Sequence, residues 1–348
     1  MKVLVTGGAG YIGSVMTRLL IEAGHEVTVL DNLSYGHRSA VTDKAKLIIG
    51  DIGDSGLLGK ILPPFPIPHS PLPHFDAVLH FAGFIRVPES VEKPDLYFDN
   101  NVGKGITLLN AVVRAGIPRF IFSSTASVYG EPDRVPITED APLRPNNPYG
   151  ETKRAFEEQL ATRTRDNGLR VACLRYFNVC GAYSGLGEDH RPETHLIPLL
   201  LKSALDPNYE FTIFGDDYPT SDGTCVRDYI HVYDLCRAHL LALSALAGAG
   251  HNPIASAQLG LCPKPLVYNL GSGHGFTVKE VLAAAEQVLG RKLKYRITGR
   301  RAGDSAALVA SSDKIQQELG WRREKPDLAT MIADAWEFHR AHPSGYPD

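Results

Sequence analysis

The sequence is short of the features that mark membrane, secreted and nucleic-acid-binding proteins. No apolar run approaches the length that crosses a bilayer, and the first residues enter a strand pattern instead of an apolar signal segment. The 36 Lys and Arg residues are offset by 39 Asp and Glu residues with interspersed signs, so there is no basic stripe for nucleic acid. We therefore expect a cytoplasmic protein whose partners include neither a membrane nor a nucleic acid.

Cysteine is also scarce, and histidine lacks the spacing of common metal sites. The five cysteines are an odd number without C-x-x-C spacing, which favours reduced thiols over a disulfide framework or a zinc site. The thirteen histidines form no H-x-x-x-H or H-E-x-x-H pattern. We therefore expect no metal.

The first half of the sequence alternates short apolar strand patterns with longer helical patterns. This alternation predicts an α/β fold, a doubly wound parallel sheet of the Rossmann type. At 348 residues the chain exceeds the length at which single cores stop growing, and its elements shorten after residue 178, which predicts a smaller C-terminal substrate-binding lobe. The expected strands are 26–31, 46–49, 77–81, 119–122, 170–177 and 266–270; the expected helices are 11–23, 94–115 and 148–167; the expected surface loops are 63–73 and 247–265.

A glycine-rich turn lies between the first apolar run and the first helical pattern. Gly7, Gly10 and Gly13 are spaced by three, and Asp31 ends the second strand pattern. Glycines permit close approach of the backbone to a pyrophosphate at a helix N-terminus, and the acid can accept from an adenosine ribose. Three glycines alone are also typical of a turn without a ligand, but the flanking strands and Asp31 favour a dinucleotide site. The carboxylate would repel a 2′-phosphate, so we expect NAD and not NADP.

A tyrosine and a lysine stand four residues apart at the start of a predicted helix. Asn147 and Pro148 are typical of a helix N-terminus, so Tyr149 and Lys153 should lie on one face. A free tyrosine has a pKa of about 10, and a nearby cation favours the phenolate; moving that pKa to about 7 corresponds to about 4 kcal/mol. Such a pair is a candidate general base, although Y-x-x-x-K alone is common on solvated helices.

Hydroxyl side chains follow the strand pattern at 119–122. Ser123, Ser124 and Thr125 should reach the carboxyl edge of the parallel sheet, where ligands bind, although a serine-rich turn is the alternative for the two serines. Arg227 stands between apolar residues just before a later strand. An unpaired guanidinium would be costly there, so a phosphate partner would suit it.

Together, these residues and their neighbours resemble the extended short-chain dehydrogenase/reductase family, and within it the branch that epimerises UDP-sugars. The resemblance covers nearly the whole chain, and its longest block, over 213–232, is the most specific. The matching motifs are V-T-G-G-A-G-Y-I-G, H-F-A-G, F-S-S-T-A-S-V-Y-G, N-P-Y-G-E-T-K, L-R-Y-F-N, I-F-G-D-D-Y-P-T-S-D-G-T-C-V-R-D-Y-I-H-V and R-R-A-G-D.

The resemblance implies an NAD-dependent interconversion of UDP-galactose and UDP-glucose by reversible oxidation at C4. It implies that the catalytic residues are Tyr149, Lys153 and Thr125. It implies NAD contacts at Gly7, Gly10, Tyr11, Ile12, Gly13, Asp31, Asn32, Asp51, Ile52, Phe81, Ala82, Gly83, Asn101, Lys153 and Phe177. It implies UDP-sugar contacts at Thr125, Tyr149, Asn178, Leu196, Thr212, Phe214, Arg227, Arg301, Asp304 and Leu308.

Three positions depart from the pattern of the family. Ile85, followed by Arg86, replaces a common lysine, so one pyrophosphate contact is lost or rerouted. His195 replaces a common asparagine in the sugar-diphosphate loop. Leu308 replaces a tyrosine or cysteine beside the C2 substituent of the sugar. These departures bear on which UDP-sugar is preferred and not on the type of reaction.

Other functions of the same family remain as alternatives. A 4-epimerase of another UDP-sugar, with an N-acetylhexosamine or a pentose, is the first. Nucleotide-sugar 4,6-dehydratases have Asp-Glu after the catalytic Thr, whereas Ala126 and Ser127 here cannot ionise. A non-catalytic NAD-binding regulator is disfavoured because Thr125, Tyr149 and Lys153 are all intact.

The resemblance also implies an organisation into two parts and a homodimer. The NAD-binding domain is expected over 1–178 with 229–262, and the UDP-sugar lobe over 179–228 with 263–348. The expected dimer contact lies on the helices at 94–115 and 148–167.

Overall fold

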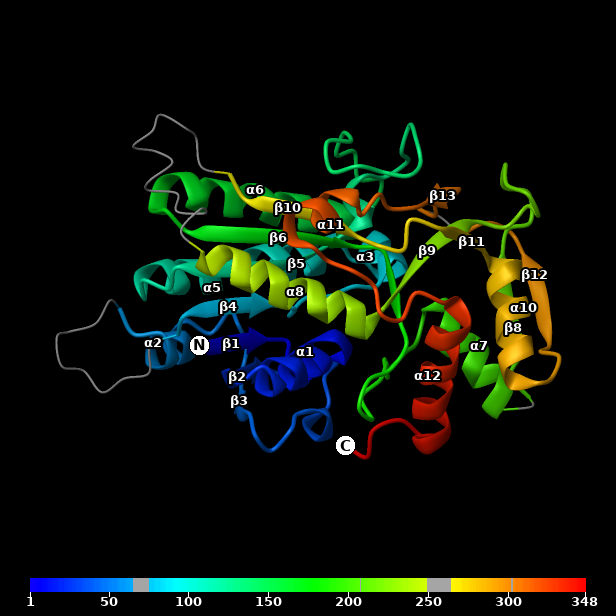
Figure 1. Ribbon diagram of the computed structural model, residues 1–348, viewed down its shortest axis with the longest axis horizontal. Helices are drawn as coiled ribbons and strands as arrows, with labels where there is room; N and C mark the ends of the chain where they lie inside the picture. The colour runs from blue at the N-terminus through cyan, green and yellow to red at the C-terminus, as the bar shows by residue number, and fades with distance from the viewer. Residues whose placement is uncertain (65–74, 207, 249–263, 302) are drawn as a thin grey trace.

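The computed structural model describes residues 1–64, 75–206, 208–248, 264–301 and 303–348. A large sheet with its helices forms one part, and a smaller group of strands and helices lies at one end of it (Figure 1). The two loops expected over 63–73 and 247–265 lie mostly outside the described residues. Among the described helices, none is both long and apolar enough to cross a membrane.

The large sheet, within the described ranges, has seven strands that all run parallel, in the order β10-β6-β5-β4-β1-β2-β3. The strands are β1 (Lys2–Thr6), β2 (Glu26–Asp31), β3 (Lys46–Ile49), β4 (Ala77–His80), β5 (Arg119–Thr125), β6 (Arg170–Tyr176) and β10 (Leu266–Leu270). This order confirms the predicted doubly wound sheet. From β1 the chain adds β2 and β3 on one side, and then β4, β5 and β6 on the other side. At such a reversal of strand order a ligand crevice opens at the carboxyl ends of the two central strands, here β1 and β4.

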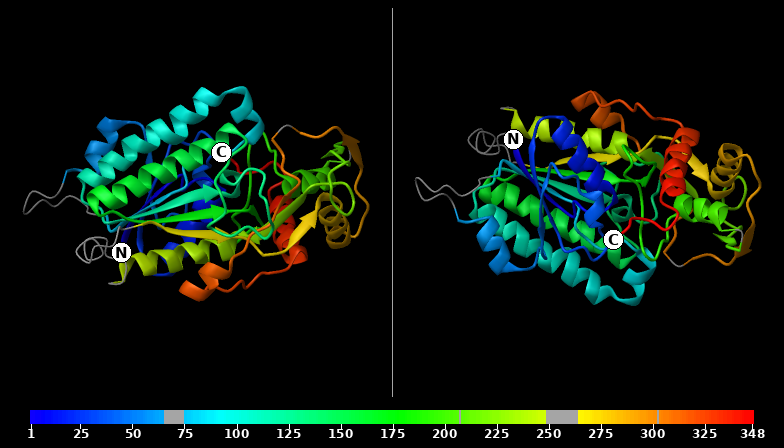
Figure 2. Two further views of the ribbon diagram at one scale, coloured as in Figure 1. Left: turned by 90° about the horizontal axis from the view of Figure 1, so that it is seen from above. Right: turned by 90° about the horizontal axis from the view of Figure 1, so that it is seen from below.

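Helices cover both faces of the sheet, as the two views of Figure 2 show. One face carries α1 (Tyr11–Glu22), α8 (Val232–Ala247) and α11 (Asp313–Leu319); the other carries α2 (Ser55–Ile61), α5 (Gly105–Arg114) and α6 (Pro148–Asn167). A hydrophobic core lies on each face of the sheet, and alternate residues of β1 point into one or the other. Val3 and Val5 pack on the α1 side, and Leu4 packs on the α5 side. Burial on both faces explains why most residues of these strands are apolar.

The prediction of one regular helix over 94–115 is wrong, because a wider helical turn interrupts it. The structure has α4 (Pro94–Phe98), a π-helical segment at Asp99–Lys104 and then α5, preceded by α3 (Val87–Glu92). The wider turn buries Asn101, whose Oδ1 accepts from the Phe84 amide at 2.8 Å and whose Nδ2 donates to the Phe84 carbonyl at 3.0 Å. The irregular turn therefore fixes the segment that follows β4.

The smaller part has its own core. Its strands are β7 (Asn178–Cys180), β8 (Phe211–Phe214), β9 (Val226–His231), β11 (Gly275–Thr277), β12 (Tyr295–Thr298) and β13 (Ala307–Leu308), and its helices are α7 (Leu196–Leu205), α10 (Val278–Leu289) and α12 (Leu328–Ala341). The side chains of Leu200, Phe211, Val281 and Met331 meet in this core. One correction concerns β10, which was expected in the lobe: it pairs with β6 along its whole length and forms an edge of the large sheet.

Candidate active site

The glycine-rich turn meets the segment after β4 at the carboxyl edge of the sheet. Gly7 has a φ of +73°, and a Cβ there would lie 2.4 Å from the amide nitrogen of Ala82. A Cβ at Gly13 would lie 2.1 Å from the carbonyl oxygen of Gly7. Gly10 is the N-cap of α1. The turn can therefore keep its shape only with glycine at positions 7 and 13, and it leaves the helix N-terminus facing the crevice.

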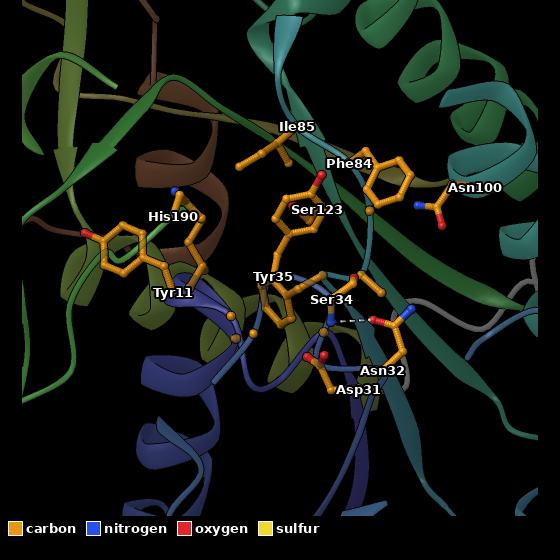
Figure 3. Close-up of a pocket in the computed structure, with 18 of the residues that line it drawn as sticks. Tyr11, Asp31, Asn32, Ser34, Tyr35, Phe84, Ile85, Asn100, Ser123 and His190 are labelled. Carbon is orange, nitrogen blue, oxygen red and sulfur yellow. Dashed lines mark hydrogen bonds between the residues drawn. The ribbon is translucent and has the colours of Figure 1, made fainter. Parts of the chain in front are cut away.

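Asp31, at the end of β2, is buried and holds the turn in place. Its Oδ2 accepts from the Ala9 amide at 2.9 Å and its Oδ1 from the Leu33 amide at 2.8 Å. Burial raises the pKa of Asp31, while these two hydrogen bonds act in the opposite direction. Figure 3 shows Asp31 and Asn32 at the base of the pocket. The carboxylate therefore has a structural task in addition to any contact with a ribose.

Most of the residues expected to contact NAD line this first pocket. They are Gly7, Gly10, Tyr11, Ile12, Gly13, Asp31, Asn32, Asp51, Ile52, Phe81, Ala82 and Gly83. Of the remainder, Asn101 supports the pocket through Phe84, Phe177 lines the neighbouring pocket, and Lys153 lies behind the strand end at Ser123. Ile85 and Arg86 also line the first pocket; the Arg86 guanidinium is paired with Glu89 at 2.8 Å.

A second pocket adjoins the first and reaches into the smaller part of the molecule. The expected sugar-binding residues that line it are Thr125, Tyr149, Asn178, Leu196, Arg227, Arg301, Asp304 and Leu308. Thr212 and Phe214 do not line it. Both belong to β8, which pairs with β12; Phe214 is exposed and reaches the site only through Arg301, whose guanidinium lies 5.5 Å from its ring centroid.

Tyr149 and Lys153 lie in the first turns of α6, as predicted. The Asn147 side chain caps this helix by accepting from the Gly150 amide at 2.9 Å. The Lys153 ammonium lies 5.8 Å from the Tyr149 ring centroid and donates to the Ser123 carbonyl at 2.8 Å. The strand end that carries Thr125 and the start of α6 therefore meet at the wall of the second pocket.

Burial has the largest effect on the pKa values of this pair. Burial raises the pKa of Tyr149 to about 12, and a hydrogen bond with Thr125 only partly opposes it. Burial lowers the pKa of Lys153 to about 8, with Glu157 acting in the opposite direction. The Lys153 ammonium donates to the Ser123 carbonyl, and it does not offset the effect of burial on the pKa of Tyr149. A positive charge beside the phenol would lower this pKa.

Arg227, for which the sequence predicts a phosphate partner, also has partners within the protein. Its guanidinium donates to the Val226 carbonyl at 2.9 Å and the Ser305 carbonyl at 2.8 Å, and lies 3.5 Å from Asp304. Arg301 also contacts Asp304, at 3.1 Å. Two guanidinium groups share one carboxylate, which leaves a net positive charge for an anionic ligand.

Sequence reasoning singled out His195 but missed the group of side chains to which it belongs, which borders both pockets. His190 and His195 each line both pockets, and Glu188 and Glu193 lie against these two histidines. Although burial lowers it, the two carboxylates raise the pKa of His190 to about 9. The signal for this group was the spacing E-x-H-x-x-E-x-H over 188–195.

Comparisons with known proteins agree with this geometry. Residues 3–257 match the model of the NAD dependent epimerase/dehydratase family. The chain is 48% identical over 350 residues to the UDP-glucose 4-epimerase of Lactobacillus helveticus, with 100% of both chains covered. A crystal structure of a UDP-glucose 4-epimerase superposes with a TM-score of 0.90 at 43% identity, covering 100% of both chains. The Bifidobacterium longum enzyme, solved with NAD⁺ and UDP, gives 0.87 at 36% identity, covering 99% of this chain and 100% of that one.

Proposed function

The chain belongs to the NAD dependent epimerase/dehydratase family, and we propose that it interconverts UDP-galactose and UDP-glucose with NAD as its cofactor. The observation that carries this conclusion is the position of Thr125 and Tyr149, with Lys153 behind them, in a pocket that adjoins the glycine-rich turn. A sugar in this pocket would have its reacting carbon between a base and a dinucleotide.

The residues of the first pocket fit NAD. A Cβ at Gly7 or Gly13 would fill the cradle, and the N-terminus of α1 faces an anionic diphosphate. Asp31 would hold the adenosine ribose. When bound, NAD⁺ supplies a hydride acceptor and a positive charge near Tyr149.

Side chains of this protein would remove and return the proton of the sugar 4-hydroxyl. Tyr149 takes the proton of the sugar 4-hydroxyl, and Thr125 holds the hydroxyl in reach of the phenol oxygen. The Lys153 ammonium, 5.8 Å from the Tyr149 ring centroid, adds positive charge on this side of the pocket. Burial raises the pKa of Tyr149 to about 12, and the positive charge of bound NAD⁺ would act in the opposite direction. After the 4-keto sugar has turned, C4 would accept the hydride on its opposite face, while Tyr149 returns the proton to the 4-oxygen.

The diphosphate end of the substrate would remain anchored during this turn. Arg227 and Arg301 share Asp304 and retain a net positive charge at the pocket wall. Binding energy at this remote end keeps the 4-keto intermediate from escaping while the sugar rotates.

Elimination of water is disfavoured by the residues after Thr125. A 4,6-dehydratase needs an acid and a base beside C5 and C6, whereas Ala126 and Ser127 occupy these positions and line the pocket. The test is to incubate the purified protein with UDP-galactose and identify the product. UDP-glucose supports the proposal, whereas a 4-keto-6-deoxy sugar or an unchanged substrate contradicts it.

Replacement of Asp31 should weaken the retention of NAD. Asp31→Ala removes a charged hydrogen-bond acceptor and two hydrogen bonds to the turn, so the affinity for NAD should fall by about tenfold or more. Asp54→Ala is the matched control, because Asp54 also accepts from two backbone amides but lies outside the pocket. The measurement is the NAD content of each purified protein. Equal retention in both variants, or NADP as the bound cofactor of the wild type, would overturn the assignment.

The size of residue 308 should set the preference between sugars. Leu308 lies opposite Arg227 in the β13–β9 pair and packs against the cluster that contains Ala126 and Phe177. We expect UDP-galactose to be the better substrate, with weak turnover of UDP-N-acetylgalactosamine. Leu308→Tyr should suppress the N-acetyl activity and Leu308→Ser should raise it, each by about 1–3 kcal/mol in kcat/KM. A ratio of the two kcat/KM values that does not change among the three proteins contradicts a position beside C2.

We propose that the two parts of the molecule bind different ligands. The large sheet and its helices, residues 1–178 and 229–262, would bind NAD, and 179–228 with 263–348 would bind the UDP-sugar, except that β10 belongs structurally to the large sheet.

A cytoplasmic homodimer is the state that we propose for the protein. Exposed apolar side chains at Val91, Leu96 and Phe98 lie on α3 and α4, and α4 packs beside α6, which supports a helical dimer contact. The free thiols of the four described cysteines suit a reducing compartment.

A further inference from the structure

The segment between β7 and α7 carries four ionisable side chains that point at one another. Glu188, His190, Glu193 and His195 each place one oxygen or ring nitrogen within 4.8 Å of the others. His190 is visible at the edge of the first pocket in Figure 3. The group lies where both pockets open, so anything that orders it also orders the shared rim of the two pockets.

The spacing of these atoms is close to that of a tetrahedral coordination shell. Zinc bonds of about 2.0–2.2 Å to nitrogen and oxygen separate the ligand atoms by roughly 3.3–3.6 Å. The Nδ1 of His190 lies 3.1 Å from Glu188 Oε1 and 3.7 Å from Glu193 Oε2. The Nδ1 of His195 lies 2.7 Å from Glu188 Oε1 and 3.0 Å from Glu193 Oε1. These four separations lie within about 1 Å of the tetrahedral values.

Ordinary ion pairs between imidazolium and carboxylate groups are the alternative, and they leave one atom unexplained. The Nδ1 of His190 is buried and has no hydrogen-bond partner of acceptable direction, although Glu188 lies 3.1 Å away. A buried donor or acceptor without a partner is costly. The His190 Nδ1 thus faces two carboxylates at 3.1 Å and 3.7 Å without a well-directed hydrogen bond, an arrangement that a shared cation would satisfy.

Charge and orientation also suit a divalent cation. Two carboxylates neutralise its charge, and neutral imidazole is a common ligand of zinc. The Glu193 carboxylate is already fixed, because its Oε1 accepts from the amides of Thr194 at 2.6 Å and His195 at 2.7 Å. Glu188, His190 and Glu193 are largely buried, whereas the His195 side chain is 38% exposed and leaves a path for entry.

We propose that Glu188, His190, Glu193 and His195 bind one divalent transition-metal ion of the zinc class. Four protein ligands complete a tetrahedral shell, so the ion would be structural and would hold the segment 188–195 over the mouths of both pockets. The inference rests on the geometry of these side chains and is independent of the reaction that the protein catalyses.

The test uses Zn²⁺ and Co²⁺ alone as probes on the full-length protein. After treatment with a chelator, the protein is loaded with ZnCl₂, passed through a desalting column and analysed for metal and for NAD. We expect about one Zn²⁺ for each chain, and a Co²⁺ complex with the strong visible absorption of tetrahedral coordination. Glu193→Gln and His190→Gln should each weaken binding more than about tenfold, since even loss of an outer-shell partner costs 10–100-fold.

The variants are chosen so that loss of binding and loss of the fold are distinct. Gln at position 193 can still accept from the amides of Thr194 and His195, and an unchanged far-UV circular dichroism spectrum shows that the fold persists. His195→Asn is the milder second variant, and His274→Ala, an exposed histidine outside both pockets, is the control that should bind Zn²⁺ as the wild type does. Absence of retained Zn²⁺ in the wild type, or equal retention in the folded cluster variants, would overturn the proposal.

Discussion

Tyr149→Phe should lower the turnover of UDP-galactose by about 10²–10⁴-fold while NAD and UDP remain bound, because a positioned general base contributes this much to the rate. The substitution removes one oxygen atom from a buried side chain at the wall of the second pocket and leaves the ring in place. The measurement is kcat for epimerisation, with NAD content and UDP affinity determined on the same preparation.

Tyr268→Phe is a matched control for this variant. Tyr268 is also buried, and Lys314 lies 5.2 Å from its ring centroid, much as Lys153 lies beside Tyr149. Tyr268 lies on β10, outside both pockets, and its hydroxyl donates to Glu318 at 2.7 Å. We expect its turnover to stay close to that of the wild type. Near-normal turnover in Tyr149→Phe would remove Tyr149 from the role of base.

Glu157→Ala should lower the free energy of unfolding by about 3–5 kcal/mol, because it leaves a buried guanidinium without its counter-charge. Glu157 on α6 and Arg175 on β6 form a bidentate pair, with distances of 3.0 Å and 2.6 Å, and their side chains are only 9% and 5% exposed. The Arg175 guanidinium also donates to the Tyr129 hydroxyl at 2.8 Å, so it cannot turn to solvent without breaking this bond as well.

The control lies one residue further along the same helix. Glu158 forms an exposed ion pair with Arg154 at 3.4 Å, and Glu158→Ala should change the free energy of unfolding by no more than about 1 kcal/mol. Both variants are unfolded in urea at the same saturating NAD concentration, because a bound ligand adds to the apparent stability. A similar small loss for the two variants would show that the buried pair is not needed for the fold.

Local patterns carried much of the fold. The second and third strands and the helix at Pro148–Asn167 have the bounds that were predicted, since β-branched runs, Asn147 and Pro148 act within a few residues of themselves. The glycine turn and Asp31 were likewise predicted from spacing, because the geometry of a strand, a tight turn and a helix is local.

Features that depend on contacts between distant residues could not be predicted from local sequence patterns. The pairing of β10 with β6 joins residues about ninety positions apart, and no local signal marks it. The widened turn at Asn101 is stabilised by its contacts with Phe84 after β4. The high pKa of Tyr149 follows from burial, which only the packed structure reveals. Thr212 and Phe214 were expected in the sugar pocket, but the pairing of β8 with β12 holds them outside its lining.

The most direct test of the proposed reaction follows the hydrogen at C4 of the sugar. UDP-galactose deuterated at C4 is incubated in ordinary water with the protein as purified, and the product is examined by NMR and mass spectrometry. Reversible oxidation at C4 predicts UDP-glucose that retains the deuterium at C4, because the hydride returns to the carbon from which it came. Deuterium found at C6 of a 4-keto-6-deoxy sugar, deuterium lost to water, or no conversion would contradict the account.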